Sequence, residues 1–266
     1  MHQSKTLNSK SSVAEVVYFW GLNLIERISS QKSYLKVGRV ILCYHSVDNS
    51  GWRFSTPPKE FEKQIKYLKR KFEIVNLSEI LSKQPSQKPL ATITFDDGYR
   101  SVYENAFPIM DKLKLTGTIF LIGNTKDRDL AVLDNSKELL HQKHINILKK
   151  TGWNLGYHTH THRSLRNLSL RHLKKELYSK FDYFAYPNGY YDDKIIATLK
   201  KFGYKYAFTV DGGVLRVKNR FLLNRIPMEG KINLIQFKSL LTPIGLVFSK
   251  IFMNLLKVKE ELFGHK

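Results

Sequence analysis

The 266-residue sequence has little cysteine and little acid. Its one cysteine, Cys43, excludes an intrachain disulfide, and nothing in the composition indicates an oxidising compartment. Cys43 lies in the apolar run 40–44, which favours a packing role. Asp and Glu number 23 against 44 Lys and Arg, so the formal net charge is +21. This excess predicts an anionic partner: nucleic acid, an anionic membrane face, an acidic polymer or a phosphorylated substrate.

The sequence also lacks an uninterrupted apolar stretch long enough to predict a transmembrane helix. Its most apolar stretch, 240–256, is interrupted by Pro243 and Lys250, so we expect a buried or interfacial helix there. The apolar-rich segment 13–25 contains Glu15 and is followed by no clean cleavage site, which favours an amphipathic helix over a secretory signal. The default expectation is a cytoplasmic location, peripheral on the inner face of the cell membrane if the terminal helices bind it.

Short apolar runs alternate with helical periodicity about seven times, with no internal repeat and no composition break. This alternation predicts βαβ units and a parallel sheet, closed or open. The expected strands are 39–44, 90–95, 117–122, 154–157, 183–186, 206–210 and 221–226. The expected helices are 13–29, 57–72, 77–82, 101–113, 136–150, 169–179, 192–202 and one at the C-terminus.

Polar side chains directly follow several of the predicted strands. Parallel α/β barrels place their active sites at the carboxyl ends of the strands. We therefore expect these residues to share one edge of the sheet: His45, Asp96, Asp97, His158, Asn188 and Asp211.

Asp96 and Asp97 are adjacent carboxylates before Gly98. Because side chains alternate along a strand, the two can point in different directions and do different work, one as a metal ligand and the other as a base. Gly98 allows the sharp turn that would follow. The alternative is an ordinary solvated Asp-Asp-Gly turn, and the motif by itself does not decide between the two.

Three of the nine histidines lie within five residues, from His158 to His162. If the segment curls, His158 and His162 can face one ion, since neutral imidazoles are common metal ligands. With Asp97 they would form a set of two histidines and one carboxylate that leaves metal positions open. An open zinc site with bound water is suited to hydrolysis. The alternative is a polar loop in which the histidines occur by chance.

Three motifs occur in the order Thr94-Phe95-Asp96-Asp97-Gly98, His158-Thr159-x-x-His162 and Phe184-Ala185-Tyr186-Pro187-Asn188-Gly189. Together they make the chain, from about Val40 to Pro227, resemble the polysaccharide deacetylases, the NodB-homology or carbohydrate esterase family 4 group. The resemblance implies a distorted (β/α)7 barrel with flanking terminal helices. We expect a polar tail and amphipathic helix over 1–38, the catalytic domain over 39–230, and a C-terminal amphipathic helix over 231–266 that packs on the barrel or a membrane.

The resemblance also implies an activity, the removal of N-acetyl groups from N-acetylhexosamine units by a metal-dependent hydrolase of non-peptide carbon–nitrogen bonds. On this reading Asp96 matches the general base. Asp97, His158 and His162 match the ligands of a divalent metal, with Zn²⁺ as the expected ion. Asn188 matches the position whose backbone N–H helps to hold the oxyanion.

The sequence departs from the family pattern in three places. No arginine precedes the motif proline, Pro187, which makes the chain similar to the aromatic-Pro-x-Gly branch that includes deacetylases of secreted poly-N-acetylglucosamine. Arg225 could supply the missing charge near Asp96, or be a surface arginine. The histidine that usually acts as general acid in the family, late in its sequence, is also absent here. The resemblance to the aromatic-Pro-x-Gly branch therefore assigns the general acid to His45, and the alternative is that His45 has only a structural role. Only 21 residues separate the second and third motifs, which makes barrel closure there doubtful.

Several functions stay open from sequence alone. The expected substrate is an N-acetylated glycan, in a polysaccharide or linked to lipid, with release of acetate. A carbohydrate O-acetyl esterase and a non-catalytic glycan-binding protein of the same fold are the alternatives. Nucleic acid is not expected, because no recognition motif is present. Segment 136–180 has ten Lys and Arg against two Glu, which favours an anionic substrate, and both terminal segments are basic enough to contact an anionic membrane.

Overall fold

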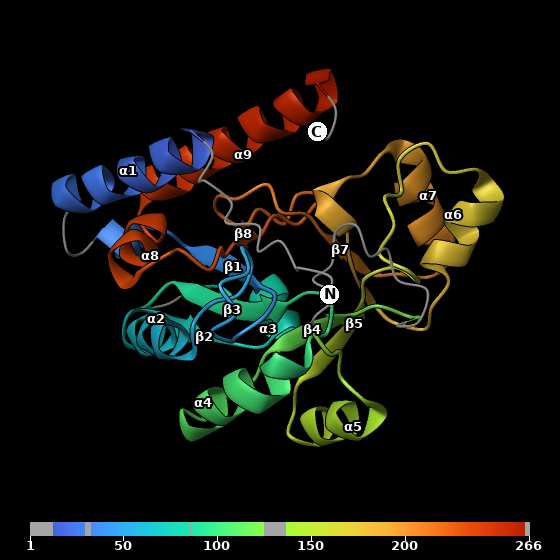
Figure 1. Cartoon of the computed structure of the whole chain (residues 1–266), viewed down its shortest axis with the longest axis horizontal. Coiled ribbons are helices and arrows are strands. Elements are labelled where there is room, and N and C mark those ends of the chain that lie inside the picture. The colour runs from blue at the N-terminus through green and yellow to red at the C-terminus, as the bar shows by residue number, and fades with distance from the viewer. Residues whose placement is uncertain (1–12, 30–32, 86, 125–136, 264–266) are drawn as a thin grey trace, which may run out of the picture.

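Seven parallel strands curve into a barrel at the centre of the molecule (Figure 1). The structure, a computed structural model, describes residues 13–29, 33–85, 87–124 and 137–263. The strand order around the barrel is β7-β6-β5-β4-β3-β1-β8, and β2 pairs with β3 beside this path. The strands are β1 Arg39–Tyr44, β2 Glu73–Ile74, β3 Leu90–Phe95, β4 Thr118–Leu121, β5 Asn154–Tyr157, β6 Tyr183–Ala185, β7 Tyr206–Phe208 and β8 Ile226–Pro227.

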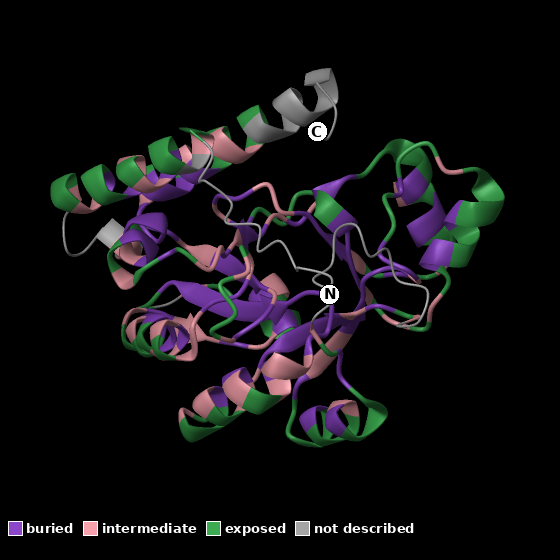
Figure 2. Cartoon of the chain, in the orientation of Figure 1, coloured by how far each residue is buried: buried purple, intermediate pink, exposed green. Residues whose placement is uncertain are grey.

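Helices surround the strands and bury one face each (Figure 2). In α2, Phe61, Ile65 and Leu68 are buried at helical spacing, while lysines occupy the outer face. Side chains cap other helices: Ser169 accepts from the N–H of His172 at the start of α6. The helices are α1 Val13–Ile28, α2 Pro58–Lys71, α3 Leu77–Ser82, α4 Phe107–Lys112, α5 Gln142–Lys150, α6 Leu170–Leu177, α7 Asp193–Lys201, α8 Leu234–Leu240 and α9 Pro243–Phe263.

The barrel closes through a short segment that contacts both of its edge strands. Leu223 bridges Phe208 of β7, and Ile226 pairs with Leu42 of β1. The predicted distorted (β/α)7 fold is confirmed. Of the strand expected over 221–226, only the last residue lies in a strand, β8. The reason is that Leu223 pairs with β7 whereas Ile226 pairs with β1, so the segment between them is not a continuous strand. β5 and β6 share only one residue pair, beside the short helix α6.

Two predicted helices differ in the structure. The helix expected over 136–150 begins only at Gln142, because Leu139 bridges Tyr99 and the N–H of Leu140 donates to Gly98. Residue 136 lies outside the described residues. The helix expected over 101–113 is a π-turn, Val102–Ala106, followed by α4. Pro108, inside α4, has no N–H to donate, which fits a change of hydrogen bonding just before it.

The C-terminal segment forms two helices where one was expected. Helices α8 and α9 meet at 92°, and Thr242 joins them: its hydroxyl donates to the carbonyl of Ser239 and accepts from the N–H of Gly245. Gly245 leaves no room for a side chain, since a Cβ there would lie 1.8 Å from the Ser239 oxygen. Among the described residues, no single helix is long and apolar enough to cross a membrane; α8 and α9 reach that length and composition only as a bent pair.

Candidate active site

The polar residues at the strand ends meet at one edge of the barrel. Asp96 and Asp97 follow β3, and His158 follows β5. His45 follows β1, and Asn188 lies just beyond β6. In the barrel β1 lies beside β3, β4 lies between β3 and β5, and β5 lies beside β6. All of these strands run parallel. Their carboxyl ends therefore come together, as in other parallel α/β barrels.

Asp97, His158 and His162 form a group of buried metal-ligand atoms. Nε2 of His162 lies 3.2 Å from Oδ1 of Asp97, and Nε2 of His158 lies 3.4 Å from the same oxygen. One ligand atom of each residue lies within 4.8 Å of the others. His162 reaches the group because the loop curls: Thr159 and His162 have φ of 67° and 63°, and the His162 N–H donates to the Thr159 hydroxyl.

The donor chemistry of this group fits a divalent cation. Nδ1 of His158 lies 2.8 Å from the carbonyl oxygen of Ala185, so its N–H donates there and Nε2 keeps its lone pair toward Asp97. Burial lowers the pKa of both His158 and His162, which favours neutral imidazoles. Two neutral imidazoles and one carboxylate hold a metal from one side and leave other positions open. Asp97, His158 and His162 could therefore bind such an ion.

Asp96 is held by a bidentate ion pair with Arg225, which directly precedes β8. Nη1 and Nη2 of Arg225 lie 2.6 Å and 2.7 Å from its two carboxylate oxygens. Arg225 is fully buried, donates also to Thr94 and Thr209, and lies over the ring of Phe120. Burial alone would raise the pKa of Asp96, but the Arg225 charge outweighs it and holds that pKa well below its ordinary value. Asp96 is therefore an ionised carboxylate in fixed orientation.

Cys43 contacts the same carboxylate, which the sequence did not indicate. Its sulfur lies 3.3 Å from Oδ2 of Asp96. Burial raises the pKa of the Cys43 thiol, so a protonated thiol donates to the carboxylate. Cys43, His45 and Asp96 also bring ligand atoms within 4.8 Å of one another. The guanidinium of Arg225 on Asp96 opposes a second cation there, so this group is better suited to proton transfer than to metal binding.

His45 lies beside Asp96 in an aromatic setting. Its ring packs on Phe54, with 4.8 Å between centroids, and meets the edge of Trp52 at 6.3 Å. Burial lowers the pKa of His45 to about 4, so the imidazole is neutral in the free protein. Its Nδ1 is buried and has no hydrogen-bond partner among the described residues. The position next to Asp96 allows His45 to exchange a proton with it.

Comparison with known proteins shows which family this site resembles. The family model for polysaccharide deacetylase matches residues 83–207, which contain Asp96, Asp97, both histidine ligand candidates and Asn188. Over these residues the chain is similar to the polysaccharide deacetylases. This confirms the family that the three motifs predicted.

Curated relatives and a solved structure match more than half of the chain. The Bacillus subtilis protein YxkH is 28% identical over 204 residues, 70% of either chain. The poly-β-1,6-N-acetyl-D-glucosamine N-deacetylase of Staphylococcus aureus is 30% identical over 183 residues, which span 59% of this chain and 62% of that protein. The structure of IcaB from Ammonifex degensii superposes with a TM-score of 0.64 at 24% identity, over 81% of this chain and 98% of that one.

Asn188 occupies the turn that follows β6. It lies in the left-handed region, with φ of 54°, inside the 3₁₀ turn Pro187–Gly189. Within this turn the N–H of Gly189 donates to the carbonyl of Tyr186, and the N–H of Tyr190 donates to the carbonyl of Pro187. Asp211, also expected at the site, instead accepts from the hydroxyl of Thr209 and is not part of the Asp97 group.

Glu176 supports the histidine loop, and sequence reasoning missed it. The carboxylate is buried in α6, where it accepts from the N–H of Thr161 at 2.9 Å and from the Thr161 hydroxyl at 2.8 Å. Its backbone carbonyl accepts from the N–H of His160. One signal was available: Glu176 is the only acid in the basic segment 163–180.

Proposed function

We propose that this chain is a metal-dependent carbohydrate de-N-acetylase that hydrolyses the acetamide of N-acetylhexosamine units and releases acetate. The observation that supports it is the pairing of an ionised, Arg225-held Asp96 with the adjacent Asp97–His158–His162 group. The proposal rests also on its place among the polysaccharide deacetylases, which are hydrolases.

Asp97, His158 and His162 would hold the metal, with Zn²⁺ as the proposed ion. When bound, such a cation supplies Lewis-acid polarisation of the amide carbonyl and makes water a better nucleophile. The carbonyl of Ala185 fixes the orientation of His158, and the carboxylate of Glu176 fixes the loop. These contacts hold the ligands before the ion arrives.

Asp96 and His45 would move the protons of the reaction. Asp96 accepts a proton from water as the water oxygen attacks the acetamide carbon, and the N–H of Asn188 stabilises the developing oxyanion. Because His45 is neutral at rest and lies beside Asp96, it can take up the proton that Asp96 received from water and become an imidazolium. The C–N bond then breaks as the nitrogen takes this proton from His45, which returns to its neutral form. The products are acetate and a free amino sugar.

The proposed substrate is an N-acetylglucosamine polymer or a lipid-linked glycan. A relative named for poly-β-1,6-N-acetyl-D-glucosamine supports the polymer. The +21 charge supports an anionic group on the glycan or its carrier.

Acetate release from defined oligosaccharides tests the proposal. We expect the chain to release acetate from N-acetylglucosamine oligomers, to lose this activity with a chelator, and to regain it with Zn²⁺. Asp97→Ala should remove both activity and stoichiometric zinc, while Asp193→Ala, at an exposed position in α7, should remove neither. Full activity in Asp97→Ala, or release of acetate only from O-acetylated sugars, would contradict the proposal.

A further inference from the structure

Helix α1 has two apolar faces, and one of them is exposed. The inner face buries Tyr18, Leu22 and Ile25 at helical spacing, and Tyr18 stacks on Phe248 and Phe252 of α9. A surface helix normally places polar residues opposite such a stripe. Here the outer face is apolar as well, and its exposed residues recur every three or four positions: Val13, Val16, Val17, Trp20, Leu24 and Ile28.

Helix α9 repeats this pattern beside α1. Its exposed apolar residues are Ile244, Val247, Ile251 and Leu255. The two helices lie side by side along one edge of the molecule, and their exposed residues face away from the barrel (Figures 1 and 2). Of the 16 large exposed apolar residues in the described chain, ten belong to this helix pair. An apolar surface so concentrated indicates a binding face rather than scattered exposure.

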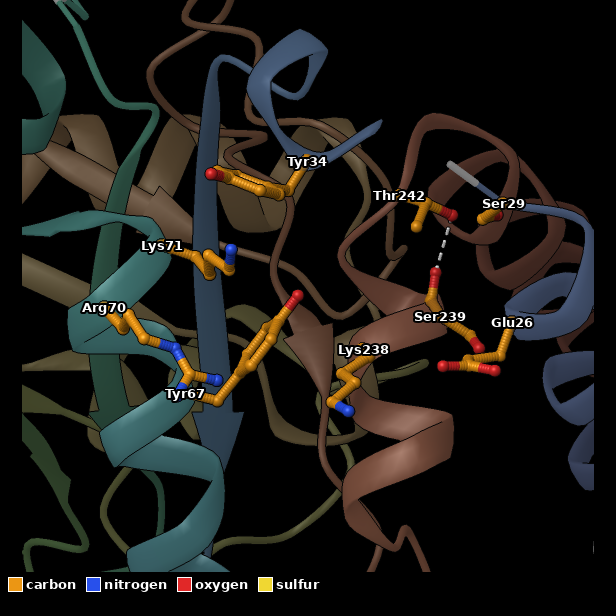
Figure 3. A pocket seen from close by; sticks show the side chains of 9 residues that line it. All are labelled: Glu26, Ser29, Tyr34, Tyr67, Arg70, Lys71, Lys238, Ser239 and Thr242. Atoms are coloured by element: carbon orange, nitrogen blue, oxygen red, sulfur yellow. Dashed lines mark hydrogen bonds between the residues drawn. The ribbon is translucent and has the colours of Figure 1, made fainter. Parts of the chain in front are cut away.

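A basic pocket adjoins this face (Figure 3). It has a volume of about 270 Å³ and lies between α1, α2 and α8. The ammonium of Lys71 lies 4.8 Å from the ring centre of Tyr34, and Arg70 and Lys238 lie 5.6 Å and 5.8 Å from that of Tyr67. Within the described residues no salt bridge joins these three cations to a carboxylate. Three converging cations against one lining acid, Glu26, form a site for an anion such as phosphate.

The pocket and the apolar face share their helices. Glu26 and Ser29 come from the end of α1, and Ser239 and Thr242 come from the junction of α8 with α9. The hydroxyl oxygen of Ser29 is buried without a described hydrogen-bond partner. Exposed Ile28 directly precedes Ser29 in the sequence, and exposed Ile244 lies two positions after Thr242. A bilayer surface places lipid phosphates directly above the acyl chains. Cations beside an apolar helix face can therefore contact the phosphates while the apolar face contacts the acyl chains.

We propose that the outer face of α1 and α9 docks on an anionic phospholipid bilayer and that the basic pocket receives a lipid headgroup phosphate. Charge favours this occupant over a second copy of the chain. Another copy would bring a further +21 charge to the contact, whereas anionic lipids bring the opposite sign. The proposal concerns a surface apart from the Asp97 group and does not depend on deacetylase activity.

Flotation of the purified full chain with lipid vesicles tests the docking surface. The chain should float with vesicles of phosphatidylcholine and phosphatidylglycerol in equal amounts, less so at high salt, and not with phosphatidylcholine alone. The double variant Trp20→Ser/Leu24→Ser should lose binding by at least about tenfold, because less apolar area enters the bilayer. Leu170→Ser, which removes a residue of similar exposure on α6, should bind as the parent chain does. Thermal melts confirm that each variant folds.

Tryptophan emission places the contact on α1. Trp20 is 67% exposed, whereas Trp153 is buried. Anionic vesicles should shift the emission to the blue in the parent chain and not in Trp20→Phe, which should still float because it keeps an apolar ring. A blue shift that persists in Trp20→Phe would contradict docking through α1.

A charge-matched pair of variants tests the pocket. Lys71→Gln/Lys238→Gln and Lys59→Gln/Lys174→Gln each remove two positive charges, but only the first pair lines the pocket. The first should weaken vesicle binding several-fold more than the second; equal losses would overturn the headgroup site. Absence of binding to anionic vesicles would overturn the docking surface. A dimer detected by light scattering that becomes a monomer in Trp20→Ser/Leu24→Ser would also overturn it. So would binding of inorganic phosphate that depends on the pocket residues, in a chain that does not bind vesicles.

Discussion

At the residue scale, the pairing of Asp96 with Arg225 defines what this site can do. The carboxylate must stay ionised while it is buried beside two histidines, and the fixed guanidinium makes that possible. The family's usual motif arginine is missing before Pro187, and the structure places Arg225, from the turn before β8, on the same acid. Arg225 thus approaches Asp96 from the start of β8, and β1 lies between β8 and the strand of Asp96, β3.

Removing Arg225 should therefore cost both stability and activity. Arg225→Met leaves a buried carboxylate without its partner, and we expect a loss of about 3–5 kcal/mol in the free energy of unfolding. Denaturant unfolding measures this loss, and acetate release measures activity. Arg225→Met/Asp96→Asn should regain part of the stability, since the unpaired charge is gone, but no activity. An Arg225→Met variant as stable as the parent chain would contradict the buried ion pair.

The role of His45 can be separated from that of Asp96 by the choice of leaving group. An amine leaves only when its nitrogen is protonated, whereas an aryl oxide leaves without a proton. His45→Ala should therefore slow acetamide hydrolysis by about 10²–10⁴-fold, the usual contribution of a general acid, and slow aryl acetate hydrolysis far less. Kinetics on the two substrates measure the difference. Equal losses on both would assign His45 to packing against Phe54 and Trp52.

At the scale of elements, the sequence predicted best where burial alone decides. The bounds of β1, β3 and β5 match the expected strands. β1 and β3 are buried along nearly their whole length, and β5 is buried at its last two residues. The bounds of β8 could not be predicted, since Leu223 and Ile226 pair with different strands. The break between α8 and α9 depends on the close approach of Gly245 to Ser239, a contact that no periodicity shows. Likewise, the sequence suggested Arg225 for Asp96, but only barrel closure places them in contact.

Helix α6 should matter to metal binding through Glu176 alone. Its carboxylate holds Thr161, one residue before the ligand candidate His162. We expect Glu176→Ala to weaken zinc binding by about 10–100-fold, the usual cost of losing a supporting contact, and Glu176→Gln to restore most of it. Competition with a chelator measures the affinity. Glu62→Ala, an exposed acid of α2, is the control. A lower melting temperature with unchanged zinc affinity would limit Glu176 to a structural role.

At the scale of the whole molecule, the net charge of the protein bears on the proposed reaction. Each acetamide that is hydrolysed leaves an amine that is positively charged at neutral pH, while the chain carries +21. A neutral polymer thus becomes a cationic product that this protein repels. Only interactions within about a Debye length, ~10 Å at 0.1 M salt, survive screening, so the repulsion should depend on salt.

This repulsion predicts a specific time course on neutral N-acetylglucosamine oligomers. The initial rate of acetate release should change little with salt, because the substrate is uncharged. Later rates should fall early at low salt and be sustained at high salt, so that the final degree of deacetylation rises with ionic strength. Acetate release followed to completion at several salt concentrations measures both phases, and acetylating the product amines should restore the early rate. An initial rate that falls steeply with salt would instead indicate attraction of an anionic glycan. Salt-independent progress at every stage would show that the charge acts elsewhere, as it would if the basic surface served the membrane alone.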